Sequence, residues 1–94
     1  MFDIRQESDG RLRLAGRLDA AQVRKAEEVL GRLAGSVVCD LEELDYISSA
    51  GLGVFVKTKL RLQAQGHTIR LVNVHARVRP IFRYAHLEEA FGIE

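Results

Sequence analysis

The residues DLEELDYISSAGLGVF, from Asp40 to Phe55, join an apolar segment at 37–39 to an amphipathic one. In the amphipathic part, apolar residues recur at the spacing of one helix face, namely Leu52, Phe55, Val56 and Leu60. The pattern predicts a central strand over 36–40 and a helix that runs to about Gln65, closed by Gly66. Two adjacent serines therefore fall where a strand leads into a helix.

Ser48 has the position and the chemistry of a helix N-cap, whose hydroxyl accepts a backbone N–H of the first turn. Ile47 and Leu52 then occupy the two positions of a hydrophobic staple. Ser49 becomes the first helical residue, and its hydroxyl is not needed for capping. Because a helix N-terminus favours negative charge, a phosphate on Ser49 would be well tolerated there.

Gly51 and Gly53 lie in the first turns of this helix, where each is about 1 kcal/mol less favourable than alanine. Two such residues have two explanations. Either a partner approaches the backbone closely at this point, or the glycines relieve crowding between the helix and the sheet. The sequence alone leaves both explanations open.

The pattern DLxxLxYISSAGLG closely resembles the signature of STAS domains, in particular the bacterial anti-sigma factor antagonists. A second marker of that family, Gly-x-Leu-Asp, matches Gly16–Asp19. In the family, a Ser or Thr before the helix is phosphorylated by a partner kinase that is also the anti-sigma factor. Matching the Gly-Leu-Gly motif places the acceptor at Ser49. The best-known members carry Asp before the acceptor, where this chain has Ser48, so Ser48 is the alternative acceptor.

The resemblance covers essentially the whole chain and implies a single STAS domain over residues 1–94. The implied fold is α/β, a mixed four- to five-stranded sheet packed against three to four helices. The implied function is partner switching: the unphosphorylated chain binds an anti-sigma factor with a serine kinase domain, and a PP2C-type phosphatase resets it after phosphorylation. The partner surface so implied consists of Asp19, Ser48, Ser49, Ala50, Gly51, Leu52, Gly53, Val54 and Lys57.

Two other functions are compatible with the same residues. A constitutive STAS adaptor subunit of a lipid-transport-type ABC system would use this surface without phosphorylation. A domain that binds a nucleotide itself is the third possibility. For Asp19, capping of the first helix together with Gln22 competes with a role on the partner surface.

Composition excludes several classes of function. The net charge of +1 provides no field for nucleic acid or an anionic membrane, and no apolar run approaches the length of a membrane span. We therefore expect a cytoplasmic protein. The three histidines show no metal-ligand spacing, no cofactor motif is present, and Cys39 reads as a buried small hydrophobe. The sequence predicts no metal, no cofactor and no enzymatic activity.

The remaining elements follow from local patterns. Asp9-Gly10 lies between two alternating runs and predicts a hairpin, and a helix from Asp19 is expected to stop at Gly35. A strand is expected over 68–72, then a helix with Pro80 in its first turn, then a short helix over 87–93 that docks Phe91. We expect Val54 and Leu62 to be exposed on the helix that follows the serines, and its water-facing stripe to contain Lys57, Arg61 and Gln65. The carboxylates Glu42, Glu43 and Asp45 are expected to lie in a loop.

Overall fold

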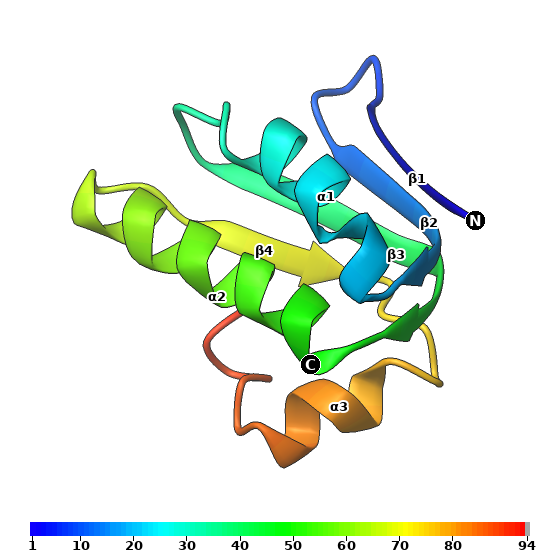
Figure 1. Ribbon diagram of the computed structural model, residues 1–94. Helices are drawn as coiled ribbons and strands as arrows, with labels where there is room; N and C mark the ends of the chain where they lie inside the picture. Colours follow the sequence, from blue (N-terminus) through cyan, green and yellow to red (C-terminus); the bar gives the residue numbers. More distant parts are fainter. Residues whose placement is uncertain (94) are drawn as a thin grey trace.

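The computed structural model describes residues 1–93, which form one mixed sheet and three α-helices (Figure 1). The elements in chain order are β1 (Phe2–Gln6), β2 (Leu12–Leu18), a 3-10 turn η1 (Ala20–Gln22), α1 (Val23–Leu30), β3 (Val37–Ile47), α2 (Ser49–Ala64), β4 (Ile69–Val72) and α3 (Arg79–Tyr84). The four-stranded mixed sheet with its helices confirms the predicted fold class.

The strands lie in sequence order, β1-β2-β3-β4. β1 and β2 form the predicted antiparallel hairpin, and Gly10 takes the positive φ of 90° that its turn requires. β2, β3 and β4 are mutually parallel, so their carboxyl ends meet at one edge of the sheet. In open α/β sheets, functional sites gather at that edge.

Helices α1 and α2 lie side by side across one face of the sheet, and α3 lies beyond β4 (Figure 1). The core between the sheet and the helices contains the inward side chains of every strand, among them Leu12, Leu14, Cys39, Leu41, Leu44 and Leu71. Phe55 of α2, Phe82 of α3 and Phe91 pack edge to face, with ring centroids 5.7–6.3 Å apart. This aromatic cluster holds the C-terminal part of the chain onto α2.

β3 is longer than predicted, because it continues from Val37 to Ile47 through residues that we expected to form a loop. Leu12 pairs with Cys39 and Leu18 with Ile47, so the seven residues of β2 lie along nine residues of β3. The two extra residues appear as register shifts, which break the regular alternation of buried and exposed side chains. Because of these shifts, the sequence pattern did not predict the second half of β3.

The predicted buried face of α2 is correct only in part, because Phe55 is fully buried and Leu52 and Val56 pack against the core, but Leu60 does not. Val54 and Leu62 are buried, whereas Leu60 is 62% exposed. The helix rests on the sheet through Gly51 and Phe55 and packs against α1 through a neighbouring side, so of the predicted stripe only Leu60 is turned outward. Local periodicity identified an apolar stripe but could not tell which of two stripes the rest of the chain would cover.

Several ends of elements also differ from expectation. α1 stops at Leu30 rather than near Gly35, and Arg61 donates to the carbonyl oxygens of Leu30 and Leu33, both at 2.8 Å, instead of facing water. Because the last carbonyls of a helix lack helical partners, the guanidinium completes the end of α1. The segment 87–93 forms turns rather than the predicted short helix.

Two expectations for this part of the chain are confirmed. Pro80 lies in the first turn of α3, where its missing N–H breaks no helical bond. Phe91 is fully buried, and its carbonyl oxygen accepts the backbone N–H of Leu71 at 3.0 Å. The C-terminal segment therefore covers part of the outer edge of β4.

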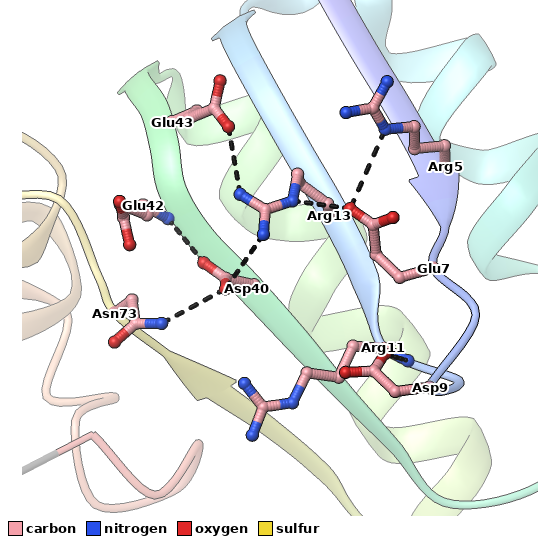
Figure 2. A network of polar contacts seen from close by, with 9 residues as sticks. All are labelled: Arg5, Glu7, Asp9, Arg11, Arg13, Asp40, Glu42, Glu43 and Asn73. Atoms are coloured by element: carbon pink, nitrogen blue, oxygen red, sulfur yellow. Dashed lines mark hydrogen bonds and ion pairs between the residues drawn. The ribbon is translucent and has the colours of Figure 1, made fainter.

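The sheet face opposite the helices is polar and is organised around Arg13 (Figure 2). The Arg13 guanidinium lies 2.7 Å from Glu7, 3.0 Å from Glu43 and 3.8 Å from Asp40. The buried Asp40 carboxylate also accepts the Asn73 amide at 3.2 Å and the Glu42 N–H at 3.0 Å. The hydrogen bond to Glu7 raises the pKa of Arg13, so the charge at the centre of this network is permanent.

The crowding at Gly51 predicts a large effect of one methyl group. A Cβ at Gly51 would lie 2.8 Å from both Cγ and the carbonyl oxygen of Leu18, so Gly51→Ala should lower the free energy of unfolding by about 1–3 kcal/mol. Gly53→Ala is the matched control, since its Cβ would have no neighbour within 4 Å. We expect it to raise stability by up to about 1 kcal/mol. Urea denaturation of both variants checks this, and equal effects would contradict it.

Cys39 predicts a loss of stability in alkaline solution. Burial raises the pKa of its thiol from 9.0 to about 12, because the folded core disfavours the thiolate. The unfolded chain therefore loses this proton first, and stability should fall as the pH rises through the window from 9 to 12. Cys39→Ala, compared with the parent chain in urea melts at a series of pH values, should remove that component. An unchanged alkaline slope would refute it.

Candidate functional site

Ser48 links the end of β3 to the start of α2 through hydrogen bonds of both its side-chain hydroxyl and its backbone N–H. Its backbone is extended, with φ −87° and ψ 170°, and its hydroxyl oxygen accepts the Gly51 N–H at 3.1 Å. Its own N–H donates to the carbonyl oxygen of Leu18 at 3.0 Å. The predicted N-cap is confirmed, and Ser48 is committed to holding the helix against the end of β2.

Ser49 is the first residue of α2 and is exposed. Within residues 1–93 its hydroxyl makes no hydrogen bond, in contrast to that of Ser48. It lies in the first turn of α2, and the N-terminus of a helix favours an anion. The arrangement places an accessible nucleophilic oxygen where added negative charge is locally stabilised.

The two glycines turn out to have different surroundings. Gly51 is buried, and its α-carbon approaches Leu18 and Ile47 too closely for any side chain. Gly53 is exposed, with open space where a side chain would be. Crowding against the sheet therefore explains Gly51, whereas Gly53 leaves the backbone of α2 open to approach from outside.

The other residues of the predicted partner surface divide into two groups. Asp19 directly follows Leu18 and accepts the Ala21 N–H at 3.1 Å, so it caps η1 at the same edge as Ser48. Its side chain forms no capping box with Gln22 among the described residues, because a 3-10 turn precedes α1. Ala50 is exposed and Leu52 is half-buried beside it.

Three members of that set do not lie on the surface at Ser49, the first being Gly51, which is buried against Leu18. Val54 is buried, 5% exposed, so it cannot make the partner contact that we expected. Lys57 is exposed but faces α1, where its ammonium lies 3.5 Å from Glu27. The structure therefore brings together Asp19, Ser48, Ser49, Ala50, Leu52 and Gly53 and leaves Gly51, Val54 and Lys57 outside this surface.

Two further residues at this edge were not predicted from the sequence. The Arg17 guanidinium lies over the Tyr46 ring, 4.1 Å from the centroid, and the two residues pair across β2 and β3. Both are exposed. Arg17 is the variable residue of the Gly-x-Leu-Asp motif, but its contact with Tyr46 depends on a register that sequence patterns do not reveal.

Other kinds of site find no support in the described part of the chain. Residues 1–93 contain no cluster of His, Cys, Asp or Glu side chains arranged to bind a metal ion. Among the same residues, no helix has both the length and the apolar character needed to span a membrane. The polar groups described at this edge are the Ser49 hydroxyl, the Asp19 carboxylate and the Arg17 guanidinium.

Comparison with known proteins shows the family to which this chain belongs. A family model described as "Mlab, STAS domain" matches residues 2–93. The anti-sigma-B factor antagonist of Bacillus subtilis is 31% identical over 96 residues, which cover 97% of this chain and 87% of that protein. The chain therefore belongs to the STAS-domain family. The B. subtilis relative that it resembles in sequence is an anti-sigma factor antagonist.

Solved structures show the same fold at lower identity. SpoIIAA, an anti-sigma factor antagonist, in its unphosphorylated form has a TM-score of 0.74 at 20% identity, over 96% of this chain and 84% of that one. The phosphorylated form of SpoIIAA from Bacillus gives 0.71 at 18% identity, over 96% and 87%. A STAS domain from Rhodobacter sphaeroides gives 0.56 at 19%, over 78% and 85%.

The different bonding of the two serines predicts different effects on stability. Ser48→Ala removes the N-cap and should lower the free energy of unfolding by about 1 kcal/mol. Ser49→Ala removes no intramolecular hydrogen bond within residues 1–93 and should change it by less than about 0.5 kcal/mol. Urea melts of the two variants, measured side by side, check the assignment. A larger loss for Ser49→Ala would reverse the roles of the two residues.

Proposed function

We propose that the protein is an anti-sigma factor antagonist that works by partner switching. Unphosphorylated, it binds an anti-sigma factor with a serine kinase domain through the surface around Ser49, and phosphorylation of Ser49 ends this binding. The observation that carries the proposal is the contrast between the two serines: the Ser48 hydroxyl holds α2 in place, whereas that of Ser49 is exposed. The similarity to the B. subtilis antagonist supports the same conclusion.

In this proposal the chain is the substrate of the reaction and not the catalyst. The Ser49 oxygen attacks the γ-phosphorus of ATP held by the kinase, an O–P bond forms, and ADP leaves with the bridging oxygen. The hydroxyl proton passes to a base of the kinase. A PP2C-type phosphatase hydrolyses the phosphoserine and restores the hydroxyl. Because the kinase needs ATP, the proposal includes a cytoplasmic location for the reaction.

The switch follows from what a phosphate does in a close interface. Phosphoserine carries a charge of about −1.5 to −2 at pH 7, and the N-terminus of α2 accepts it without disturbing the fold. A partner packed against Ser49 and the open backbone at Gly53 meets extra bulk and a charge that it must desolvate. A difference of about 2.7 kcal/mol between the two forms changes affinity about a hundredfold.

The two alternatives predict different observations. A constitutive adaptor of a lipid-transport-type ABC system would bind its ATPase with no phosphate on Ser49. The relatives named above are antagonists, which favours the switch. A domain that binds nucleotide itself would give a calorimetric signal with ATP or GTP, and we expect a flat titration.

The site of phosphorylation is the first prediction to test. Peptide mass spectrometry of protein purified from its own cells, with and without phosphatase treatment, should find one phosphate, on Ser49. Ser49→Ala should abolish it, and Ser48→Ala should keep it. A phosphate on Ser48 would move the acceptor by one residue, and no phosphate under any growth condition would overturn the switch.

The binding step needs its own measurement. Ser49→Ala should recover a protein with a serine kinase domain from the same cells, and the purified kinase should bind this variant about a hundredfold more tightly than it binds the phosphorylated chain. Equal affinities would contradict the proposal even if Ser49 were phosphorylated.

A further inference from the structure

Arg17 differs from Arg13, the other arginine of β2. Arg13 is surrounded by three carboxylates (Figure 2), whereas Arg17 forms no ion pair within residues 1–93. Its charged group instead lies 4.1 Å from the centre of the Tyr46 ring. The positive charge of Arg17 is thus held in an ordered position, exposed and without a counter-ion.

The second register shift of β3 produces this arrangement. Gly16 pairs with Leu44 and Arg17 with Tyr46, so Asp45 is the extra residue between the two pairs. In a regular pairing Asp45 would stand opposite Arg17. Instead, one of its carboxylate oxygens is buried and has no hydrogen-bond partner among the described residues. The bulge therefore replaces a carboxylate with an aromatic ring beside Arg17.

A guanidinium ordered on a ring is well suited to bind a carboxylate of another protein. Contact with the ring limits the side chain's motion, so less entropy is lost when a partner binds it. The ring attracts the cation without neutralising it, and the guanidinium N–H groups remain available to a planar acceptor. Arg and Tyr are also among the residues enriched at the centres of protein interfaces.

The pair adjoins the surface at Ser49. Leu18, the residue after Arg17, accepts the Ser48 N–H, and Ile47, the residue after Tyr46, pairs with Leu18. Arg17 and Tyr46 each precede by one residue the Leu18–Ile47 pair at the start of α2. Because Leu18 and Ile47 are buried beneath the helices, Arg17 and Tyr46 project from the opposite sheet face, and a protein that covers Ser49 and extends around this edge would meet the pair at the margin of its contact.

We propose that Arg17, positioned by Tyr46, binds a carboxylate of the serine kinase partner and helps to determine which kinase is recognised. The proposal rests on the proposed function, since it assumes that the kinase docks around Ser49. It adds the residue that provides charge selectivity and the residue that orients it.

The test compares variants in titrations against the purified kinase recovered with Ser49→Ala, all in that same background. Arg17→Ala should weaken binding about tenfold and Arg17→Glu more. Tyr46→Leu should weaken it severalfold, and Tyr46→Phe, which keeps the ring, should restore the parent affinity. Arg11→Ala is the matched control, an exposed arginine at the opposite end of β2, and should leave the affinity unchanged.

Salt dependence separates a charge contact from a change in shape. The affinity of the parent chain should fall more steeply with ionic strength than that of Arg17→Ala, because one ion pair is missing from the variant. Circular dichroism and urea melts should show all the variants folded. Ser49→Glu in place of the alanine background should reduce binding whether or not Arg17 is present.

The outcomes distinguish the two proposals. If Ser49→Ala binds the kinase and Arg17→Ala and Arg17→Glu bind as well as Arg11→Ala, the role of Arg17 is overturned while the switch stands. If Tyr46→Phe binds as weakly as Tyr46→Leu, the ring does not position Arg17. If no kinase binds the Ser49→Ala chain, both proposals fail.

Discussion

The close contact between the backbone of Gly51 and Leu18 is the constraint on which the rest of the site depends. No side-chain atom fits between them, so the first turn of α2 rests directly on the end of β2. Once that side of the helix is buried, its opposite side must face solvent. Ser49 and Gly53 are exposed for this reason, and their accessibility is a property of how the helix is seated rather than of local flexibility.

The ends of β2 and β3 provide the polar and charged groups that surround the start of α2. The Leu18 carbonyl oxygen accepts the Ser48 N–H, which joins the two strands and the helix at one point. The register shift just before it directs Tyr46 toward Arg17. The charge of Arg13 on the same strand is matched by carboxylates, whereas Arg17, beside the serines, forms no ion pair within residues 1–93.

The features that sequence reasoning predicted correctly depend on neighbouring residues, and those it missed depend on distant ones. The Ser48 cap, the turn at Gly10 and the place of Pro80 follow from a few consecutive residues each. The buried side of α2 depends on where α1 packs, so Val54 and Leu60 were assigned to the wrong faces. The length of β3 and the contact between Arg17 and Tyr46 depend on two register shifts between β2 and β3. These shifts interrupt the alternation of buried and exposed side chains along the strand.

The coverage of the sheet edges limits how this protein can be recognised. On β4, the outward N–H of Leu71 donates a hydrogen bond to the carbonyl oxygen of Phe91. On β1, the carbonyl oxygen of Phe2 accepts a hydrogen bond from the ammonium of Lys25 at 2.8 Å. A foreign strand that tried to extend the sheet at either place would first have to displace these groups. Recognition by backbone addition is thereby disfavoured there, and selectivity is left to side chains, which can diverge between paralogues without disturbing the sheet.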